Sequence, residues 1–225
     1  MISFKGRHFQ QSMILQSVRW YVAYPLSYRQ IEEMMKERGY DVDHSTIQRW
    51  VVHYCPQLEK AFHKKKQQPI GRWRLDETYI KVKGKWKYLY RAADKTGHTI
   101  DFLLTAKRDK KAALRFLNKA ILRNTKPSLI NMDKSGANKA AVNAYNKASH
   151  QQIEVRQVKY LNNIVEQDHQ GVKRVTRPML GFQHFHAAQK TLTGIELMHM
   201  LKKGQMKKQF RGNLSPAEQF YSLAE

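Results

Sequence analysis

The stretch WRLDETYIKVKGKWKYLYRAADKTGHTIDFLLT, residues 73–105, decides the fold. Its apolar and polar residues alternate as they do in strands, and two turn-forming segments interrupt them. The expected strands cover residues 73–82, 86–93 and 99–105. The segments between them, Lys83-Gly84-Lys85 and Asp94-Lys95-Thr96-Gly97, suit hairpins, so the three strands should be antiparallel.

The rest of the central region alternates between helix and strand patterns. In order, we expect a helix over residues 109–123, a short apolar strand at 129–132, a helix over 137–148, a fifth strand at 153–158, a helix from 162 and a helix over 184–203. Three antiparallel strands followed by such alternation predict an α/β (α+β) sheet with helices on its faces. This order of elements is that of ribonuclease-H-like folds.

The first 55 residues predict three short helices. They cover about residues 14–24, 27–39 and 45–54. Ser27 with Gln30 and Ser45 with Gln48 form capping boxes, and Gly39 suits the end of the second helix. Two helices joined by a tight turn and braced by a third predict an N-terminal all-α helix-turn-helix domain. A three-helix bundle that contacts protein is the alternative.

The outward face of the third helix carries side chains that can donate to base edges and phosphates. These are Ser45, Thr46, Gln48, Arg49 and His53. A polar, basic run follows and predicts an interdomain linker. We expect its lysines, Lys64, Lys65 and Lys66, to contact the phosphate backbone.

The chain carries 41 Lys+Arg residues against 18 Asp+Glu, a net charge of +23. Residues 71–180 hold 24 of the basic and 9 of the acidic residues, so the excess is not confined to a detachable tail. Nucleic acid is the first expected partner, although a ribosomal or heparin-binding protein would share this charge.

Cysteine usage and hydropathy exclude several classes of protein. The single cysteine, Cys55, excludes an internal disulfide and a Cys-rich zinc site, and the ten histidines lack zinc-ligand spacing. Neither a signal peptide nor an apolar run of membrane-spanning length is apparent, so we expect a cytoplasmic protein that remains with the DNA.

Three carboxylates stand in three different elements of the basic region. Asp76 lies in a strand, Asp133 at the end of a short apolar strand and Glu166 in a helix. Alternation places Asp76 on the strand face of Ile80, where a carboxylate is costly unless a metal ion compensates its desolvation. Glu77 points to the opposite face. Pairing of Asp76 with an arginine and capping of the next helix by Asp133 are the alternatives.

The helix that carries Glu166 has a polar stripe. Lys173 lies two turns after Glu166, and the other members are Asn162 and Asn163 one turn before it and His169 and Gln170 one turn after it. Tyr160-Leu161 and Ile164-Val165 supply the buried side. Such a stripe suits metal and phosphate binding, and a solvated helix face is the alternative.

Together these segments resemble a known family. LDETYIKVKGKWKYLYRAAD, NMDKSG and KYLNNIVEQDHQGVKR, with FKGRHF, LSYRQIEEMMKERG and VDHSTIQRWV before them, are similar to DDE-type bacterial insertion-sequence transposases, most closely to insertion-sequence family six. The segment after Asp133 departs from the family, whose members often have a proline-bearing stretch there, and the spacing from Asp133 to Glu166 is slightly short.

The resemblance implies a catalytic triad of Asp76, Asp133 and Glu166 that holds two Mg²⁺ or Mn²⁺ ions, with Lys173 as the basic residue seven positions after the glutamate. It implies binding of terminal inverted repeats and of target DNA, strand cleavage and strand transfer, and cointegrate products. The side chains expected to contact DNA near the triad are Asn163, His169, Lys173 and Arg174. Joining two ends implies at least a homodimer.

The sequence thus predicts a helix-turn-helix domain over residues 1–62, a basic linker at 63–71, a catalytic domain at 72–205 and a C-terminal tail with a short helix at 206–225. Two other functions stay open: a metal-dependent nuclease of the same fold that does not join strands, and a DNA-binding regulator without chemistry. A structural nucleoid protein is a further rival.

Overall fold

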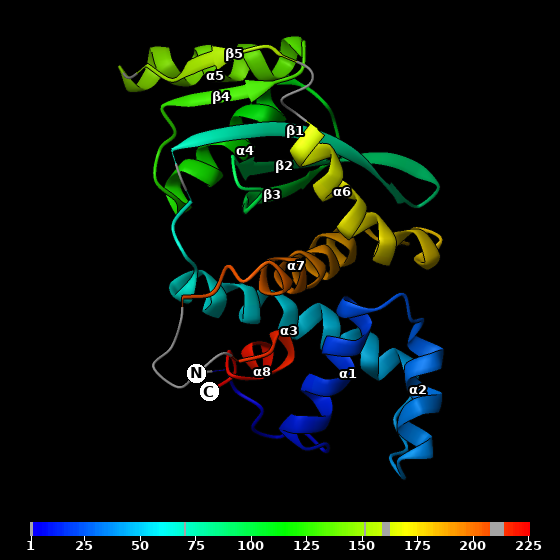
Figure 1. Cartoon of the computed structure of the whole chain (residues 1–225). Coiled ribbons are helices and arrows are strands. Elements are labelled where there is room, and N and C mark those ends of the chain that lie inside the picture. The colour runs from blue at the N-terminus through cyan, green and yellow to red at the C-terminus, as the bar shows by residue number, and fades with distance from the viewer. Residues whose placement is uncertain (1, 70, 151, 159–162, 208–213) are drawn as a thin grey trace. The chain divides into compact units, whose positions relative to one another are not determined.

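The computed structural model describes residues 2–69, 71–150, 152–158, 163–207 and 214–225 (Figure 1). The chain forms two compact units, one of Met1–Gln67 with Val172–Glu225 and one of Gln68–Gly171. None of the helices in the described ranges combines the length and the apolarity that a bilayer crossing needs.

The second unit is built on a five-stranded mixed sheet. Its strands are β1 (Arg72–Val82), β2 (Lys85–Asp94), β3 (Thr99–Thr105), β4 (Leu129–Met132) and β5 (Glu154–Arg156). Their order is β3-β2-β1-β4-β5, with β1 antiparallel to β2, β2 antiparallel to β3, and β1, β4 and β5 parallel. This is the sheet of a ribonuclease-H-like fold, as predicted, although β5 is shorter than expected.

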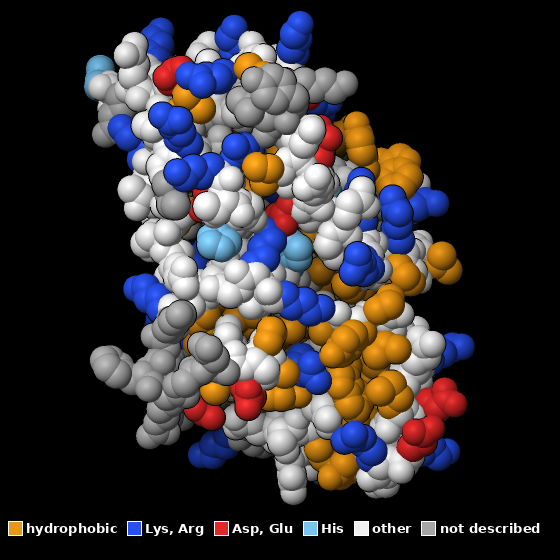
Figure 2. Space-filling view, viewed as in Figure 1, with side chains coloured by type: hydrophobic (Ala, Val, Ile, Leu, Met, Phe, Trp, Pro, Cys, Tyr) orange, Lys and Arg blue, Asp and Glu red, His pale blue; other side chains and the backbone are white. Residues whose placement is uncertain are grey.

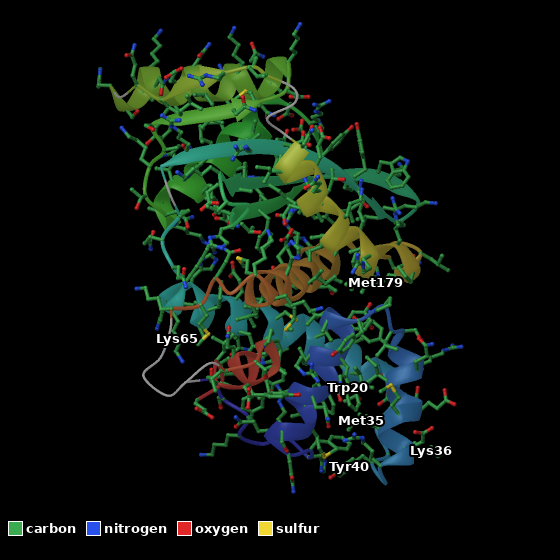
Figure 3. All side chains as sticks on the ribbon, viewed as in Figure 1. Trp20, Met35, Lys36, Tyr40, Lys65 and Met179 are labelled. Carbon is green, nitrogen blue, oxygen red and sulfur yellow. The ribbon has the colours of Figure 1, made fainter. Side chains whose placement is uncertain are left out.

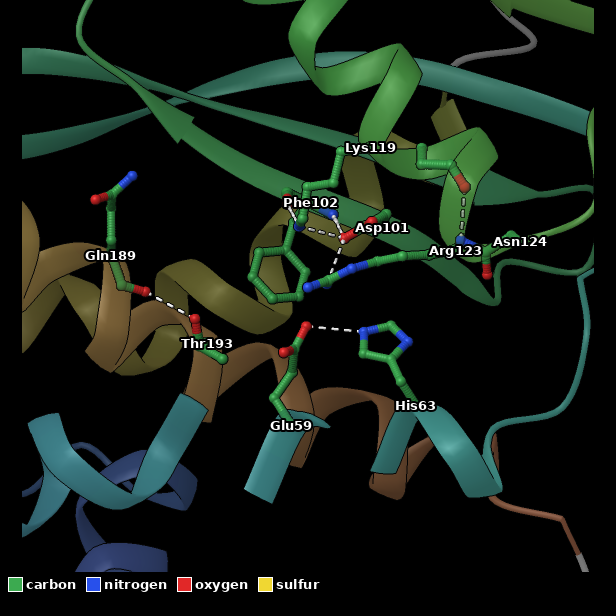
Figure 4. Close-up of polar contacts among 10 residues, drawn as sticks. Glu59, His63, Asp101, Phe102, Lys119, Arg123, Asn124, Gln189 and Thr193 are labelled. Carbon is green, nitrogen blue, oxygen red and sulfur yellow. Dashed lines mark hydrogen bonds and ion pairs between the residues drawn. The ribbon is translucent and has the colours of Figure 1, made fainter. Parts of the chain in front are cut away.

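Two helices, α4 (Lys110–Arg123) and α5 (Gly136–Ser149), supply apolar side chains to the core on one face of this sheet. From β1 that core takes Trp73 and Leu75, which are 1% and 2% exposed. Helix α4 is fixed to β3 by charge as well, because the Lys119 ammonium donates to the buried Asp101 carboxylate at 2.6 Å (Figure 4). The odd-numbered side chains of β1 therefore face α4 and α5, and the even-numbered ones face the other way.

The hairpin between β1 and β2 is closed by a two-residue turn. Lys83 and Gly84 lie between the paired residues Val82 and Lys85, and both have positive φ, 49° and 72°. Positive φ at both positions is typical of the type I′ turn that matches the strand twist. The turn therefore sets the pairing of the long hairpin, as the sequence predicts.

The first unit consists of helices. They are α1 (Gln11–Ala23), α2 (Tyr28–Glu37), α3 (His44–Lys65), α7 (Phe185–Lys202) and α8 (Pro216–Tyr221). Ser27 and Gln30 form the predicted capping box of α2, and Gly39 follows that helix with a φ of 81°. Trp20 of α1 and Met35 of α2 are both buried in this unit (Figure 3).

Helix α3 is longer than predicted at both ends. Its N-cap is Asp43, whose carboxylate accepts from two backbone N–H groups, and not Ser45. It continues through Pro56 to Lys65, because buried side chains such as Leu58 and Phe62 extend its apolar stripe beyond the proline. The predicted linker at residues 63–71 is thus still helical at its start.

The two ends of the chain form one unit, contrary to the predicted division. Helix α7 packs against α1 and α3 and is not part of the sheet unit, and α8 packs against α1 and α7. Gly194 permits the close approach of α7, since a Cβ there would lie 2.4 Å from the Cys55 sulfur and 2.7 Å from a Val22 methyl. The expected tail helix exists, with the capping box of Ser215 and Glu218, and its Phe220 is buried.

We predict that Gly194→Ala destabilises the protein, because the added methyl group meets the side chains of two neighbouring helices. Overpacking of this kind costs about 1–3 kcal/mol. Gly136→Ala, in α5, is the matched control, since a Cβ there has no neighbour within 4 Å. Urea unfolding of both variants measures the effect, and equal midpoints would contradict the close packing of α7.

Candidate active site

Strand pairing brings two of the three predicted acids to neighbouring positions. In the parallel register of β1 and β4, Leu75 lies opposite Met132, so the next positions are Asp76 and Asp133. Adjacent strands are about 4.8 Å apart. Asp76 shares its strand face with Thr78 and Ile80, each 3% exposed, and its own side chain is 15% exposed. The expected placement of Asp76 on a largely apolar face is confirmed.

Helix α6 (Asn163–Thr176) brings the third acid to the same face of the sheet. Nδ1 of His169 lies 3.8 Å from Oδ2 of Asp76, and Glu166 is one turn before His169 with an exposed side chain. The buried Val165 and Val172 supply the apolar side of the helix. Its expected start, with Tyr160, Leu161 and Asn162, lies outside the described residues.

A buried ion pair fixes α6 to the sheet. Arg91 of β2 lies opposite Asp76 in the register and is fully buried, and it pairs with Asp168 at 2.9 Å. The Thr99 hydroxyl donates to the same carboxylate at 3.3 Å. Asp168 is two residues after Glu166 and points to the sheet side of the helix, so this pair sets the side that Glu166 occupies.

The pKa of Asp76 depends on its burial and on the acids near it. Burial, as the largest cause, together with the negative charges of Glu77, Asp133 and Glu166, raises the pKa of Asp76 from 3.8 to about 7, although the backbone N–H of Glu77 lowers it. Asp133 and Glu166 are thus near enough for their charges to act on Asp76. Within the described ranges, however, no three His, Cys, Asp or Glu side chains stand together at metal-binding distance.

Asp133 is held by groups other than the other two acids. Its carboxylate accepts from the backbone N–H of Ser135 at 3.0 Å and lies 3.6 Å from an Arg108 nitrogen. Helix α5 is capped by Ser135, so Asp133 is not needed as its N-cap. Glu77 lies on the opposite face of β1, as predicted, and accepts from Arg108 and from Asn138.

Sequence reasoning missed the residues that hold these acids in place. Arg91, Asp168, Arg108 and Asn138 were not among the predicted site residues. The alternation of β1 and β2 could have indicated Arg91, because it is a charged residue in a strand of otherwise apolar and small neighbours. The others are brought to the site by pairing between distant segments, which spacing alone does not predict.

The remaining residues expected near the triad lie on α6. Asn163 is exposed at the first position of the helix, and Lys173 and Arg174 are in its last turn, half-buried and exposed respectively. Lys173 therefore follows Glu166 by two turns of one continuous helix, as predicted.

The predicted DNA-contacting side chains of α3 differ in their solvent exposure and in their hydrogen bonds within the protein. The hydroxyls of Ser45 and Thr46 donate to Asp43, each at 2.5 Å, and so serve the start of the helix. Gln48, Arg49 and His53 are exposed. Together with Thr46 they line a hollow of about 720 Å³, which is also lined by Arg7, His8 and Lys190. Burial, then the charges of Arg7 and Lys190, lower the pKa of His53.

The three lysines of the expected linker are not equivalent. Lys64 is exposed, whereas Lys65, labelled in Figure 3, donates to the carbonyl of Ser222 at 3.2 Å, and Lys66 is only 2% exposed. Lys66 pairs as an isolated bridge with Met206. The prediction of phosphate contacts by all three therefore needs correction, because the chain is still folded at Lys66.

Comparison with known proteins places the chain in a family. Residues 71–205 match the model of the DDE domain of IS240 transposases, and residues 8–133 match that of the IS66 family of transposases. The chain belongs to the DDE transposases. The transposase of insertion sequence-like element IS431mec from Staphylococcus aureus strain Mu50 is 42% identical to this transposase over 202 residues, 89% of this chain and 88% of that protein.

A second relative of this transposase, that of element IS257 in transposon Tn4003 from Staphylococcus aureus, is 41% identical over 202 residues, 89% of this chain and 88% of that protein. Among solved structures, the HTLV-2 integrase catalytic core in complex with magnesium is a distant match. It is 16% identical with a TM-score of 0.47, over 67% of this chain and 96% of that one. The resemblance noted in the sequence is thus confirmed at the level of the family.

We predict that breaking the ion pair under α6 destabilises the transposase. Asp168→Asn leaves the Arg91 guanidinium buried without its charge partner, which costs about 3–5 kcal/mol. Glu154→Gln is the control, because the Glu154 side chain is 61% exposed and should contribute less than about 1 kcal/mol. Chemical unfolding compares the two, and an Asp168→Asn protein as stable as the control would show that the pair does not hold the helix.

Asp76 should make the metal-free protein less stable as the pH rises. Because folding raises its pKa from 3.8 to about 7, the folded protein keeps a proton that the unfolded chain releases, and the free energy of unfolding falls between about pH 4 and pH 7. Asp76→Asn removes this loss. In chelator at pH 8 the free energy of unfolding of the variant should therefore exceed that of the wild type, by at most about 4 kcal/mol. The two should agree near pH 4, and equal free energies of unfolding at pH 8 would contradict the raised pKa of the buried Asp76.

Proposed function

We propose that this transposase binds the terminal inverted repeats of an insertion sequence and catalyses metal-dependent DNA cleavage and strand transfer, with Asp76, Asp133 and Glu166 as the catalytic acids. One observation carries the proposal: the Asp76 carboxylate is buried on the sheet beside the position of Asp133 and near helix α6, and this burial, with the negative charges of Glu77, Asp133 and Glu166 as lesser causes, raises its pKa to about 7. A buried carboxylate near other acids destabilises the fold when it is ionised, and a bound cation removes that destabilisation.

The donor set fits a hard divalent cation. Carboxylate oxygens are the ligands that Mg²⁺ and Mn²⁺ prefer, whereas zinc favours cysteine and histidine. Asp76, Asp133 and Glu166 would hold two ions. Asp133 is restrained by one loop hydrogen bond and a 3.6 Å ion pair, both of which a divalent cation can displace.

Bound divalent ions supply Lewis-acid activation of the attacking oxygen and stabilisation of the leaving oxygen. Hydrolysis of one phosphodiester frees a 3′-hydroxyl at the element's end, and that hydroxyl then attacks a target phosphodiester and displaces the target's own 3′-oxygen. This transesterification needs no nucleophilic side chain. Lys173 and Arg174 supply positive charge for the phosphates, and Asn163 orients the strand, whereas His169, expected to do the same, is only 4% exposed and lies beside Asp76.

The helical unit is proposed to recognise the ends. Gln48, Arg49 and His53 are exposed along α3 and suit contacts to bases and phosphates in a major groove. Arg7 and Lys190 add positive charge around the same hollow. Two ends must be joined, so we propose at least a homodimer, with cointegrates as the product.

Replacement of the acids tests the chemistry. Asp76→Asn, Asp133→Asn and Glu166→Gln should each lower strand transfer of labelled element ends into a plasmid by about a thousandfold or more, since activation by the metal is worth several kcal/mol. Binding of the ends should persist in all three. Glu154→Gln removes an exposed acid outside the cluster and should transfer strands normally.

The same assay separates the rival functions. A nuclease would nick the labelled ends without giving joined products, and a regulator would bind the ends and leave them intact in Mg²⁺. Either result for the wild-type protein would refute the proposal, as would full activity of Asp76→Asn.

A further inference from the structure

The outer end of the β1–β2 hairpin presents aromatic side chains on one face. In the register, Tyr79 lies opposite Tyr88 and Lys81 lies opposite Trp86, so all four side chains emerge on the same side. Tyr79 is 51% and Trp86 60% exposed. We call these four residues the aromatic face. They lie on the side of β1 opposite to Asp76.

The rings of the aromatic face contact one another and still leave surface open. The Tyr79 ring centroid is 6.3 Å from that of Trp86 at 74°, and 5.5 Å from that of Tyr88 at 55°. Figure 2 shows hydrophobic side chains beside basic ones where Figure 1 places the hairpin end. Large exposed aromatic side chains in a cluster are typical of binding surfaces.

The charge around this face selects the kind of partner. Residues 79–88 contain four lysines and no acid: Lys81, Lys83, Lys85 and Lys87. Lys81 belongs to the aromatic face, Lys83 is in the turn, and the others emerge on the opposite side of the hairpin. Exposed aromatic rings with lysines nearby are the combination with which proteins bind single-stranded nucleic acid, because the bases stack on the rings and the phosphates contact the cations.

We propose that the aromatic face stacks unpaired bases of single-stranded DNA, with Trp86 and Tyr79 as the platform. The proposal builds on the proposed function and adds a site for the unpaired strand. Tyr79 is three residues along β1 from Asp76, about 10 Å. An unpaired strand stacked here lies on the other face of β1 from Asp76, so the platform would hold a part of the strand outside the acid site, and without sequence preference, because every base has a face that can stack.

A second copy of the chain fits this face less well. A symmetric contact through the face would bring the lysines of two hairpins together, in a protein whose net charge is +23. A polyanion gains from those same charges. Charge complementarity therefore favours DNA as the occupant.

Tryptophan fluorescence tests the proposal directly. Trp20, Trp50 and Trp73 are at most 8% exposed, so Trp86 is the exposed tryptophan of the chain. Titration of the full-length Asp76→Asn protein with a short single-stranded oligo(dT) should quench the emission of Trp86. Trp86→Leu should weaken oligo(dT) binding, followed by anisotropy of a labelled oligonucleotide, by about 5- to 150-fold, and Trp86→Phe should bind within about threefold of the parent.

Matched variants keep stacking separate from general effects. Leu122→Ala removes an apolar side chain that is 88% exposed on α4 and should bind oligo(dT) normally. Lys81→Ala should reduce the slope of log K against log salt by about 0.7, and Lys147→Ala, on α5, should leave it unchanged. These experiments measure binding and no reaction. A failure here therefore leaves the proposed catalytic acids untouched, and a failure of the strand-transfer assay leaves the proposed stacking site untouched.

Equal oligo(dT) affinity of the Trp86→Leu and Trp86→Phe proteins would overturn the proposal. Leucine can bury apolar surface but cannot stack on a base, so equal affinities would show that stacking contributes nothing. Sedimentation velocity supplies the other decisive result. If Trp86→Leu converts an oligomer into a monomer and leaves the oligo(dT) affinity unchanged, the aromatic face is a contact between copies of the chain and not a DNA site.

Discussion

The parallel pairing of β1 with β4 is the constraint on which the acid site depends. It places Asp76 and Asp133 at neighbouring positions although 56 residues separate them in the chain. Other contacts of the sheet unit complete the surroundings of these two acids. The β1–β2 turn extends β1 as a hairpin, and the Arg91–Asp168 pair adds α6 with Glu166 to the same face. Backbone hydrogen bonding plus one buried ion pair thus bring Asp76, Asp133 and helix α6 to one part of the sheet.

The buried pair and the crowded acids have opposite effects on stability. The buried Arg91 is neutralised by Asp168, and this pair holds a helix in place, whereas burial, together with the charges of nearby acids, resists the ionisation of Asp76. Such a contrast is common at functional sites, where the supporting contacts are neutralised within the protein and a carboxylate with a perturbed pKa is not.

Much of the sheet unit could be predicted because its signals are local. Strand alternation, two glycine turns and the cap residue Asp109 define elements within a few residues of themselves. The third helix was misjudged because Pro56 is a local signal for an end, and the distant packing of Leu58 and Phe62 overrides it. The network of Arg108 with Glu77 and Asp133 joins three separate segments, so no spacing in the sequence indicates it.

The approach of α7 to α3 at Gly194 has a consequence for synthesis of the protein. The helices that include α3 acquire their partners, α7 and α8, only from the last quarter of the chain. During translation the sheet unit can fold first, while the apolar surfaces of α1 and α3 that pack against α7 and α8 stay exposed to solvent. A ribosome that stops early would therefore release a chain whose N-terminal helices lack the partners α7 and α8, so truncated products should be unstable.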